Sequence, residues 1–102
     1  MPNSVLLTVC ATISPEKENE FNEWYDRHHI PDMVRLSGCR TGTRYRVVDG
    51  DNSHQYMAFY EFDDLETLEQ FRSSEGQVWL INEYDRLFGD VSARVRTVYQ
   101  KI

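Results

Sequence analysis

The sequence predicts a single α+β domain in which four β-strands form one antiparallel sheet and helices cover it. The first observation is the order in which the hydrophobic period changes along the chain: strand, helix, strand, strand, helix, strand. The second is length, because 102 residues suit one domain, residues 1–102, and leave little room for another. The third is composition, since 40% apolar residues are enough for a packed core.

The first strand and the first helix have clear sequence signals. Residues 5–13 are β-branched and apolar throughout, which predicts a strand buried on both faces. Ser14-Pro15-Glu16 then combines an N-cap serine, a proline at the first helical position and an acid in the first turn. A helix carrying aromatic side chains is therefore predicted to begin here.

Pro31 determines how this first helix is expected to end. Proline disfavours the helical conformation of the preceding residue, Ile30, so we expect a break or kink near His28 and His29. A short helical turn is predicted to follow, and Gly38 is suited to close it.

The middle of the chain predicts a hairpin followed by a helix. Residues 39–48 alternate between two faces, 49–53 form a polar turn, and 55–62 return as a second strand. Asp63 and Glu66 have the spacing of a capping box, which predicts that the next helix starts there.

A further helical stretch is predicted at 77–88, after a break at 74–76, and residues 92–102 alternate as a closing strand. The complete order is the split βαβ arrangement of the ferredoxin-like fold, βαββαβ, with a four-stranded antiparallel sheet.

The predicted strands are apolar on both faces, whereas a ferredoxin-like sheet has helices on only one. Val5 and Tyr60 have one parity, and Leu6, Phe59 and Val98 have the other. Burial of both faces without a second helical layer predicts that a second copy of the chain covers the free face. The alternative is a monomer whose partly apolar sheet face is wet.

Charge and cysteine content exclude several classes of function. A formal net charge of −6 argues against nucleic acid or an anionic membrane as the main partner. Cys10 and Cys39 lack metal-ligand spacing and are interpreted as reduced core thiols. No apolar run is long enough to span a membrane, and Met1-Pro2-Asn3 does not begin a signal peptide, so we expect a cytoplasmic protein.

The residues best suited to chemistry are concentrated at 21–32. Trp24 and His28 are four residues apart, as are Tyr25 and His29, so each pair is predicted to share a helix face. A histidine at a helix break could titrate near neutral pH and move protons. Tyr25 could donate a hydrogen bond to an enolate or carbonyl oxygen.

Structural roles are open for the same residues. A carboxylate, either Asp32 or Asp26, could orient an imidazole, but a histidine before Ile-Pro could equally cap the broken helix. Trp24 is better explained as core than as a ligand contact. No metal is expected, because adjacent histidines on a helix point about 100° apart.

The stretch Trp24-Tyr25 to His29-Ile30-Pro31 resembles the W-Y-x-x-x-H-(I/L/V)-P signature of small EthD-like members of the dimeric α+β barrel superfamily. The resemblance extends to Gly38, to the basic and aromatic strand that follows it, and to a terminal strand that begins Ser92-Ala93-Arg94-Val95. It implies a homodimer in which two sheets pair into a barrel, with a ligand pocket between sheet and helices. The family histidine falls on His29, and His28 occupies a variable position of the motif.

Such relatives include lactone isomerases, polyketide cyclases, quinol-type monooxygenases and haem-degrading enzymes. The resemblance does not extend to the asparagine-tryptophan-histidine set of the haem-degrading branch, because Asn22 and Trp24 lie too close together.

A second pattern is the separation of charge between predicted helices, which are acidic, and predicted strands, which are basic. The strand arginines occupy even-numbered positions, namely Arg40, Arg44, Arg46, Arg94 and Arg96. They could form ion pairs or protect edge strands, and Glu61 is one available partner. Alternatively they line a site for a carboxylate-bearing or phenolate-like substrate.

Together these patterns lead to a hypothesis of a small-molecule enzyme that needs no metal and no cofactor. It would transfer protons on an activated carbonyl or aromatic-type substrate in isomerase, cyclase or lyase chemistry. His29 is the expected general acid or base with His28 as a second candidate, Tyr25 stabilises an oxyanion, and Arg44 or Arg46 holds an anionic group. Trp24 and Asp32 are expected substrate contacts. The rivals are a cofactor-independent monooxygenase and a non-catalytic ligand-binding or accessory homodimer.

Overall fold

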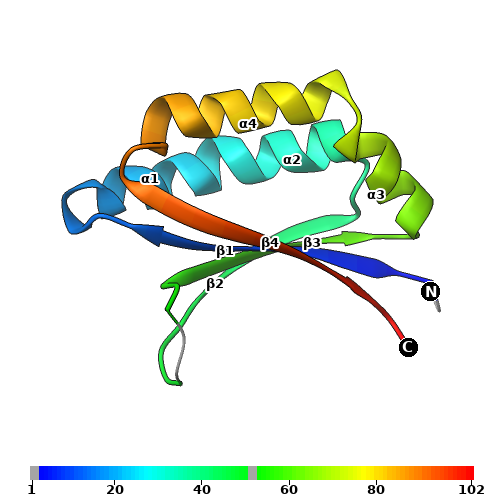
Figure 1. Ribbon diagram of the computed structural model, residues 1–102, viewed down its shortest axis with the longest axis horizontal. Coiled ribbons are helices and arrows are strands. Elements are labelled where there is room, and N and C mark those ends of the chain that lie inside the picture. The colour runs from blue at the N-terminus through cyan, green and yellow to red at the C-terminus, as the bar shows by residue number, and fades with distance from the viewer. Residues whose placement is uncertain (1–2, 51–52) are drawn as a thin grey trace.

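The computed structural model describes residues 3–50 and 53–102, and these form a helical layer packed on one face of a single sheet (Figure 1). The four strands are antiparallel in the order β2-β3-β1-β4. Their bounds are β1 (Val5–Ile13), β2 (Thr41–Arg46), β3 (Tyr56–Phe62) and β4 (Ser92–Gln100). The predicted ferredoxin-like α+β fold is therefore confirmed.

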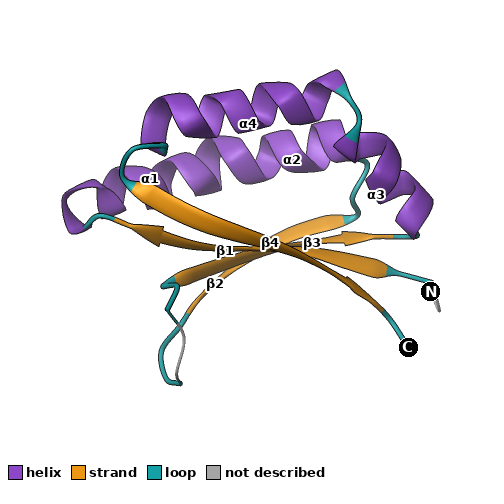
Figure 2. Ribbon diagram, viewed as in Figure 1, coloured by secondary structure: helices purple, strands orange, loops and turns teal. Residues whose placement is uncertain are grey.

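The helical layer consists of two long helical runs and one short helix. The first run joins a 3₁₀ turn η1 (Pro15–Lys17), α1 (Glu18–Trp24), a π-helical turn η2 (Tyr25–His29) and α2 (Ile30–Ser37). The others are α3 (Leu65–Arg72) and α4 (Glu75–Phe88). Figure 2 shows all of them on the same side of the sheet, which leaves the other sheet face without a helix.

The core lies between the sheet and the helices and is built from alternate residues of the two central strands. Side chains of β1 and β3 that face the helices are buried, as the strand period of two requires. They pack against the apolar stripes of α1, α3 and α4. The largest fully buried side chains are Tyr60, Tyr84, Phe21, Phe62, Leu68 and Val5.

The opposite sheet face is only partly covered and is mixed in character. Tyr45 of β2 stacks on Phe59 of β3, with ring centroids 5.5 Å apart and planes 7° apart. On β4, Val95 and Tyr99 lie on this face and are 53% and 54% exposed. The sheet therefore presents aromatic and aliphatic side chains to solvent on the side away from the helices.

A break or kink was predicted near His28 and His29, and the break does not occur. Ile30 has helical backbone angles, φ −60° and ψ −50°, and the chain stays helical through Pro31 into α2. In a regular α-helix the proline ring would collide with the carbonyl group four residues earlier. The π-helical turn η2 widens the backbone immediately before Pro31, so the helix is locally widened instead of broken.

The start of α3 is also shifted from its predicted position. The N-cap is Asp64, whose Oδ1 accepts a hydrogen bond from the Thr67 backbone amide at 2.8 Å. Asp63 instead forms an ion pair with Arg40 at 3.0 Å. The predicted hairpin between β2 and β3 is confirmed, although residues 51–52 of its predicted turn lie outside the described residues.

Within the two described ranges, no helix combines the length and the apolar character needed to cross a membrane.

Candidate functional site

The π-helical turn η2 brings the aromatic residues of the first helical run together. The backbone amide of Ile30 donates to the carbonyl of Tyr25, five residues earlier. In a regular α-helix, residues five apart lie about 140° apart around the axis, so Trp24 and His29 would not meet. In η2 they stack, with centroids 4.7 Å apart and planes 24° apart. The wide turn therefore adds a contact between Trp24 and His29, while Trp24 and His28 share a face of the helical run, as predicted, and line the same outer hollow.

His29 is enclosed on the inner side of this turn. Its side chain is 8% exposed, and the ring of Tyr25 meets it edge to face at 4.8 Å. Among the residues that the structure describes, its Nδ1 is buried and has no hydrogen-bond partner. A structural cap would bond a free carbonyl, so this histidine does not have the contacts of a helix cap.

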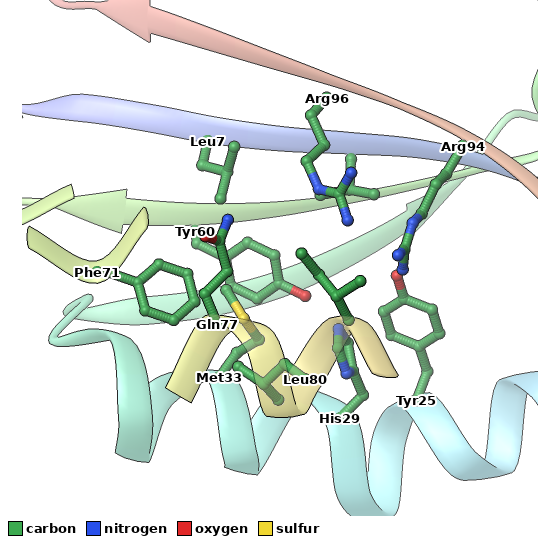
Figure 3. A pocket seen from close by; sticks show the side chains of 12 residues that line it. Leu7, Tyr25, His29, Met33, Tyr60, Phe71, Gln77, Leu80, Arg94 and Arg96 are labelled. Carbon is green, nitrogen blue, oxygen red and sulfur yellow. The ribbon is translucent and has the colours of Figure 1, made fainter. Parts of the chain in front are cut away.

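A small cavity of about 30 Å³ lies beside His29, between the helices and the sheet (Figure 3). Tyr25 and His29 project into this region from the helical run, and Arg94 and Arg96 project toward them from β4. Tyr60 reaches it from β3. The remaining lining is mainly apolar: Leu7, Val9, Met33, Phe71, Gln77, Leu80 and Ile81. A cavity of this volume has room for one or two water molecules or a group of similar size.

The surroundings of His29 strongly favour its neutral form. Burial, together with the positive charges of Arg94, Arg96 and Arg44, lowers the pKa of His29 from 6.5 to about 3. The pKa of His29 therefore lies well below the neutral range in which the sequence led us to expect its titration. At pH 7 the imidazole is uncharged and is able to accept a proton or, through its other nitrogen, to donate a hydrogen bond.

The tyrosines around the cavity are held in the protonated form. Burial raises the pKa of Tyr25, and the nearby Tyr84 raises it further against the opposing effect of the arginines. Burial also raises the pKa of Tyr60, which is 0% exposed and whose hydroxyl lacks a partner among the described residues. The Tyr84 hydroxyl, by contrast, is bonded to Ser92 Oγ at 2.6 Å. Tyr60 therefore offers an unused hydrogen-bond donor.

The two arginines of β4 differ in their contacts. The guanidinium of Arg94 lies 3.7 Å from the centre of the Tyr84 ring and pairs with Asp85 at 3.4 Å. Arg96 makes no hydrogen bond or ion pair with any described residue. Burial and the charge of Arg94 lower the pKa of Arg96, as expected of two neighbouring cations that are not both neutralised.

Three of the predicted site residues lie outside this cavity, on the other side of His29. Trp24, His28 and Asp32 line an outer hollow of about 270 Å³ between the first helical run and α4. His28 is exposed, and Asp32 bonds to Arg35 at 3.1 Å instead of orienting an imidazole. Trp24 is half-buried and packs on the aromatic core, including Phe88 at 5.3 Å.

The two arginines predicted to hold an anionic group lie in a separate surface depression. Arg44 is bonded to Asn22 at 2.8 Å and to Asp26 at 3.1 Å, and its guanidinium covers the Tyr25 ring at 4.3 Å. Arg46 lines the same depression, near the hairpin end of β2. The structure therefore groups His29 and Tyr25, but it does not bring Arg44 or Arg46 into the cavity lining.

Sequence reasoning missed Tyr60 and did not choose Arg94 or Arg96 for the site. Arg94 and Arg96 occupy even-numbered positions of a predicted strand. Arg44 and Arg46 do so as well, so this pattern alone does not distinguish the two pairs. The deciding information is the sheet order, because β4 pairs with β1 and not with β2. The sequence pattern around Tyr60 predicted only that its side chain is buried in an alternating strand.

No group of three or more His, Cys, Asp or Glu side chains within residues 3–50 and 53–102 is arranged to hold a metal ion. The donors around the cavity are an imidazole, phenols and guanidinium groups, so we assign no metal ligand to them.

A ferredoxin-like sheet with a small cavity under its helices places the chain among α+β proteins with the fold of EthD-like structures. Its fold matches an ethyl tert-butyl ether D (EthD) family protein from Bacillus halodurans C-125, with a TM-score of 0.76, 20% identity and 97% and 99% of the two chains covered. The sequence belongs to the family described as a domain of unknown function (DUF4286), whose pattern it matches over residues 4–102.

Two further solved structures have the same fold. One is SnoaB, a cofactor-independent oxygenase from Streptomyces nogalater, with a TM-score of 0.70, 15% identity and 95% and 91% of the two chains covered. The other is Rv0793 from Mycobacterium tuberculosis, with a TM-score of 0.68, 18% identity and 98% and 96% covered. A search of curated proteins finds no match.

The buried imidazole predicts a specific dependence of stability on pH. Below pH 6.5 the unfolded chain protonates His29, whereas the folded chain keeps it neutral until about pH 3. The unfolded state then binds more protons, so the free energy of unfolding falls as pH falls, by up to about 1.4 kcal/mol per pH unit from this residue. Urea unfolding from about pH 7 down to about pH 4 should show a steeper loss for the wild type than for His29→Gln. Parallel curves would contradict the burial of a neutral imidazole.

The unpartnered hydroxyl predicts that Tyr60→Phe does not destabilise the protein. Removing a buried donor without a partner should leave the free energy of unfolding unchanged or raise it by up to about 1 kcal/mol. Tyr56→Phe on the same strand is the matched control, because the Tyr56 hydroxyl accepts from Asn22 at 3.0 Å and donates to Glu18. That variant should lose about 1 kcal/mol. Equal losses in both variants would mean that the Tyr60 hydroxyl has a partner.

Proposed function

We propose that this protein is a homodimeric enzyme that moves a proton on a small activated carbonyl or aromatic-type substrate, using its own side chains. The observation that carries the proposal is the buried, neutral His29 with an unpartnered Nδ1 beside a cavity. An unpaired buried nitrogen costs stability, so its retention is typical of a functional site.

In this proposal His29 accepts the proton that the substrate loses. The imidazole is neutral at pH 7, so it is in the basic form without a prior deprotonation step. Trp24 and Tyr25 fix the orientation of its ring by stacking and edge contact. When His29 accepts the proton it becomes a positively charged imidazolium. This cation then faces the substrate anion that the same proton transfer creates.

The developing negative charge on the substrate would be stabilised by donors already aimed at the cavity. The phenol of Tyr60 is protonated and has no hydrogen-bond partner among the described residues, and that of Tyr25 is protonated and lines the same space. Arg94 and Arg96 add positive potential in a partly desolvated region, where electrostatic stabilisation of an oxyanion is strongest.

The homodimer in the proposal is supported by the sheet face without helices. Tyr45, Val95 and Tyr99 are each more than half exposed there. A second copy of this face would bury these side chains against each other, in the manner of sheets that pack face to face.

Cofactor-independent oxygenation is a second candidate. SnoaB, which shares this fold, is described as an oxygenase of that kind. Removal of a proton from a reduced aromatic substrate also makes that substrate a better electron donor to O₂, so the same base serves both reactions.

The non-catalytic alternative requires a histidine bonded to backbone with no space beside it. The unpartnered Nδ1 and the adjacent cavity support the catalytic reading over this one.

Replacing His29 should abolish proton transfer. A metabolite library is first screened by thermal shift, and each hit is incubated with enzyme in D₂O while the loss of its C–H signal is followed by NMR. His29→Gln should reduce the exchange rate by about 10²-fold to 10⁴-fold. His54→Gln, in the β2–β3 hairpin, is the control and should exchange at the wild-type rate.

Exchange that persists in His29→Gln would remove His29 from the mechanism. Repeating the incubation with and without O₂ separates the two candidate reactions: consumption of O₂ that depends on substrate and His29 favours oxygenation.

A charge on the free sheet face should separate the dimer. Val95→Glu places a carboxylate among the apolar side chains of that face, and burying it would be unfavourable. Light scattering after gel filtration should give twice the chain mass of 12.1 kDa for the wild type and the mass of one chain for Val95→Glu. Val78→Glu on α4, at a position 58% exposed, should remain dimeric. A monomeric wild type would contradict the proposed dimer.

A further inference from the structure

Arg96 is a cation that lines the cavity and has no counterion among the described residues. It lies on edge strand β4, is exposed, and also lines the cavity. The arginines Arg40, Arg44 and Arg94 each have a carboxylate partner, at 3.0, 3.1 and 3.4 Å. Arg96 has none among the described residues, so its five N–H donors are available to a ligand.

The cavity behind Arg96 contains two more unused polar atoms. The Tyr60 hydroxyl and His29 Nδ1 are both buried without a partner in the described chain. Figure 3 shows the Arg96 side chain directed from the sheet toward the space in which Tyr60 and His29 lie. Three groups that lack partners therefore surround one small space, which points to a ligand that would satisfy them together.

The charge of this space is positive, although the chain as a whole carries a net charge of −6. Its lining includes Arg94 and Arg96 and no acidic side chain. Asp85 pairs with Arg94 from outside the lining, whereas Arg96 forms no ion pair with a described residue. A ligand that places a single negative charge here would balance the charge of Arg96.

We propose that the substrate is a carboxylic acid whose carboxylate enters the cavity and is bound by the guanidinium of Arg96 and the hydroxyl of Tyr60. This inference rests on the proposed function and names its substrate class. The cavity of about 30 Å³ accommodates a group of carboxylate size, so the apolar body of the substrate lies toward the mouth. Leu80, Ile81 and Phe71 belong to the apolar part of the cavity lining.

A planar carboxylate suits these groups better than a phosphate does. The guanidinium fork matches a carboxylate through two parallel hydrogen bonds, and a second charge would have no counterion. A carboxylate next to His29 would also oppose the effect of Arg94 and Arg96 on the imidazole. Binding of the anion would therefore make His29 a stronger base at the moment when the substrate is in place.

The test is a binding measurement that does not depend on turnover. Benzoate, its neutral isostere benzamide and inorganic phosphate are each titrated into the 102-residue protein and followed by backbone amide NMR. Benzoate should shift amides of η2, β3 and β4, and benzamide should not. Arg96→Gln should weaken benzoate binding by about tenfold or more, because a charge-assisted pair is lost. Arg96→Lys keeps the positive charge but lacks the two parallel N–H donors of the guanidinium. Its benzoate affinity should lie between those of the wild type and Arg96→Gln.

Arg46→Gln is the matched control. It removes another strand arginine that faces a different depression, and benzoate affinity should be unchanged. Tyr60→Phe should weaken benzoate binding by a few fold, since a neutral donor contributes less than a charged one. Affinity that is equal in wild type and Arg96→Gln would overturn the proposal. The proposal would also be overturned if phosphate bound in a manner that depends on Arg96 while benzoate did not bind.

The outcome is separable from that of the proposed function. If Arg96→Gln loses benzoate while His29→Gln retains proton exchange, the carboxylate site stands and the catalytic assignment fails. If His29→Gln loses exchange and benzoate binds independently of Arg96, the base stands and the carboxylate site fails.

Discussion

The burial of His29 between Trp24 and Tyr25 is the constraint on which the site depends. The ring stacks on the indole at 4.7 Å and meets the phenol edge at 4.8 Å, so its orientation is fixed by aromatic packing without any hydrogen bond from the described chain. The contact with Trp24 requires the π-helical turn, because only a widened turn brings residues five apart onto one side. Burial in turn keeps the imidazole neutral, and it leaves the nitrogen unpaired. Backbone geometry, aromatic packing and protonation state are therefore three consequences of one local arrangement.

The distribution of charge follows from the two layers. Acidic residues of the helices meet arginines of the strands: Arg44 pairs with Asp26, and Arg94 pairs with Asp85. The two carboxylates are 68% and 59% exposed, so each pair contributes little free energy. Their effect is on position, since they hold guanidinium groups over the rings of Tyr25 and Tyr84. Arg96 lacks such a partner, which distinguishes it from the arginines that connect sheet to helix.

The elements of the fold were predictable from the sequence because each has its own local signal. A continuous β-branched and apolar run located β1, alternation located β2 and β4, and the hairpin turn located β3. The apolar residues on both faces of the sheet predicted the uncovered side. The motif from Trp24 to Pro31 predicted the EthD-like fold and located His29. The π-helical turn was not predictable, since it is a shift of one backbone hydrogen bond, and the proline that accompanies it is also typical of a break. Choosing Arg94 and Arg96 over Arg44 and Arg46 required the order of the strands, which is a property of the assembled sheet.

Strand β4 contributes side chains to both faces of the sheet. It therefore takes part in the cavity on one face and in the proposed dimer interface on the other. Its residues alternate, so that Arg94 and Arg96 face the cavity while Val95 and Tyr99 lie on the open face. As an edge strand, β4 is held by hydrogen bonds to β1 on one side only. A second copy packed on Val95 and Tyr99 would restrict the motion of the same backbone that carries the two arginines. Covering the open face would therefore also fix the guanidinium groups at the cavity, which is the precision that electrostatic stabilisation of a small anion requires.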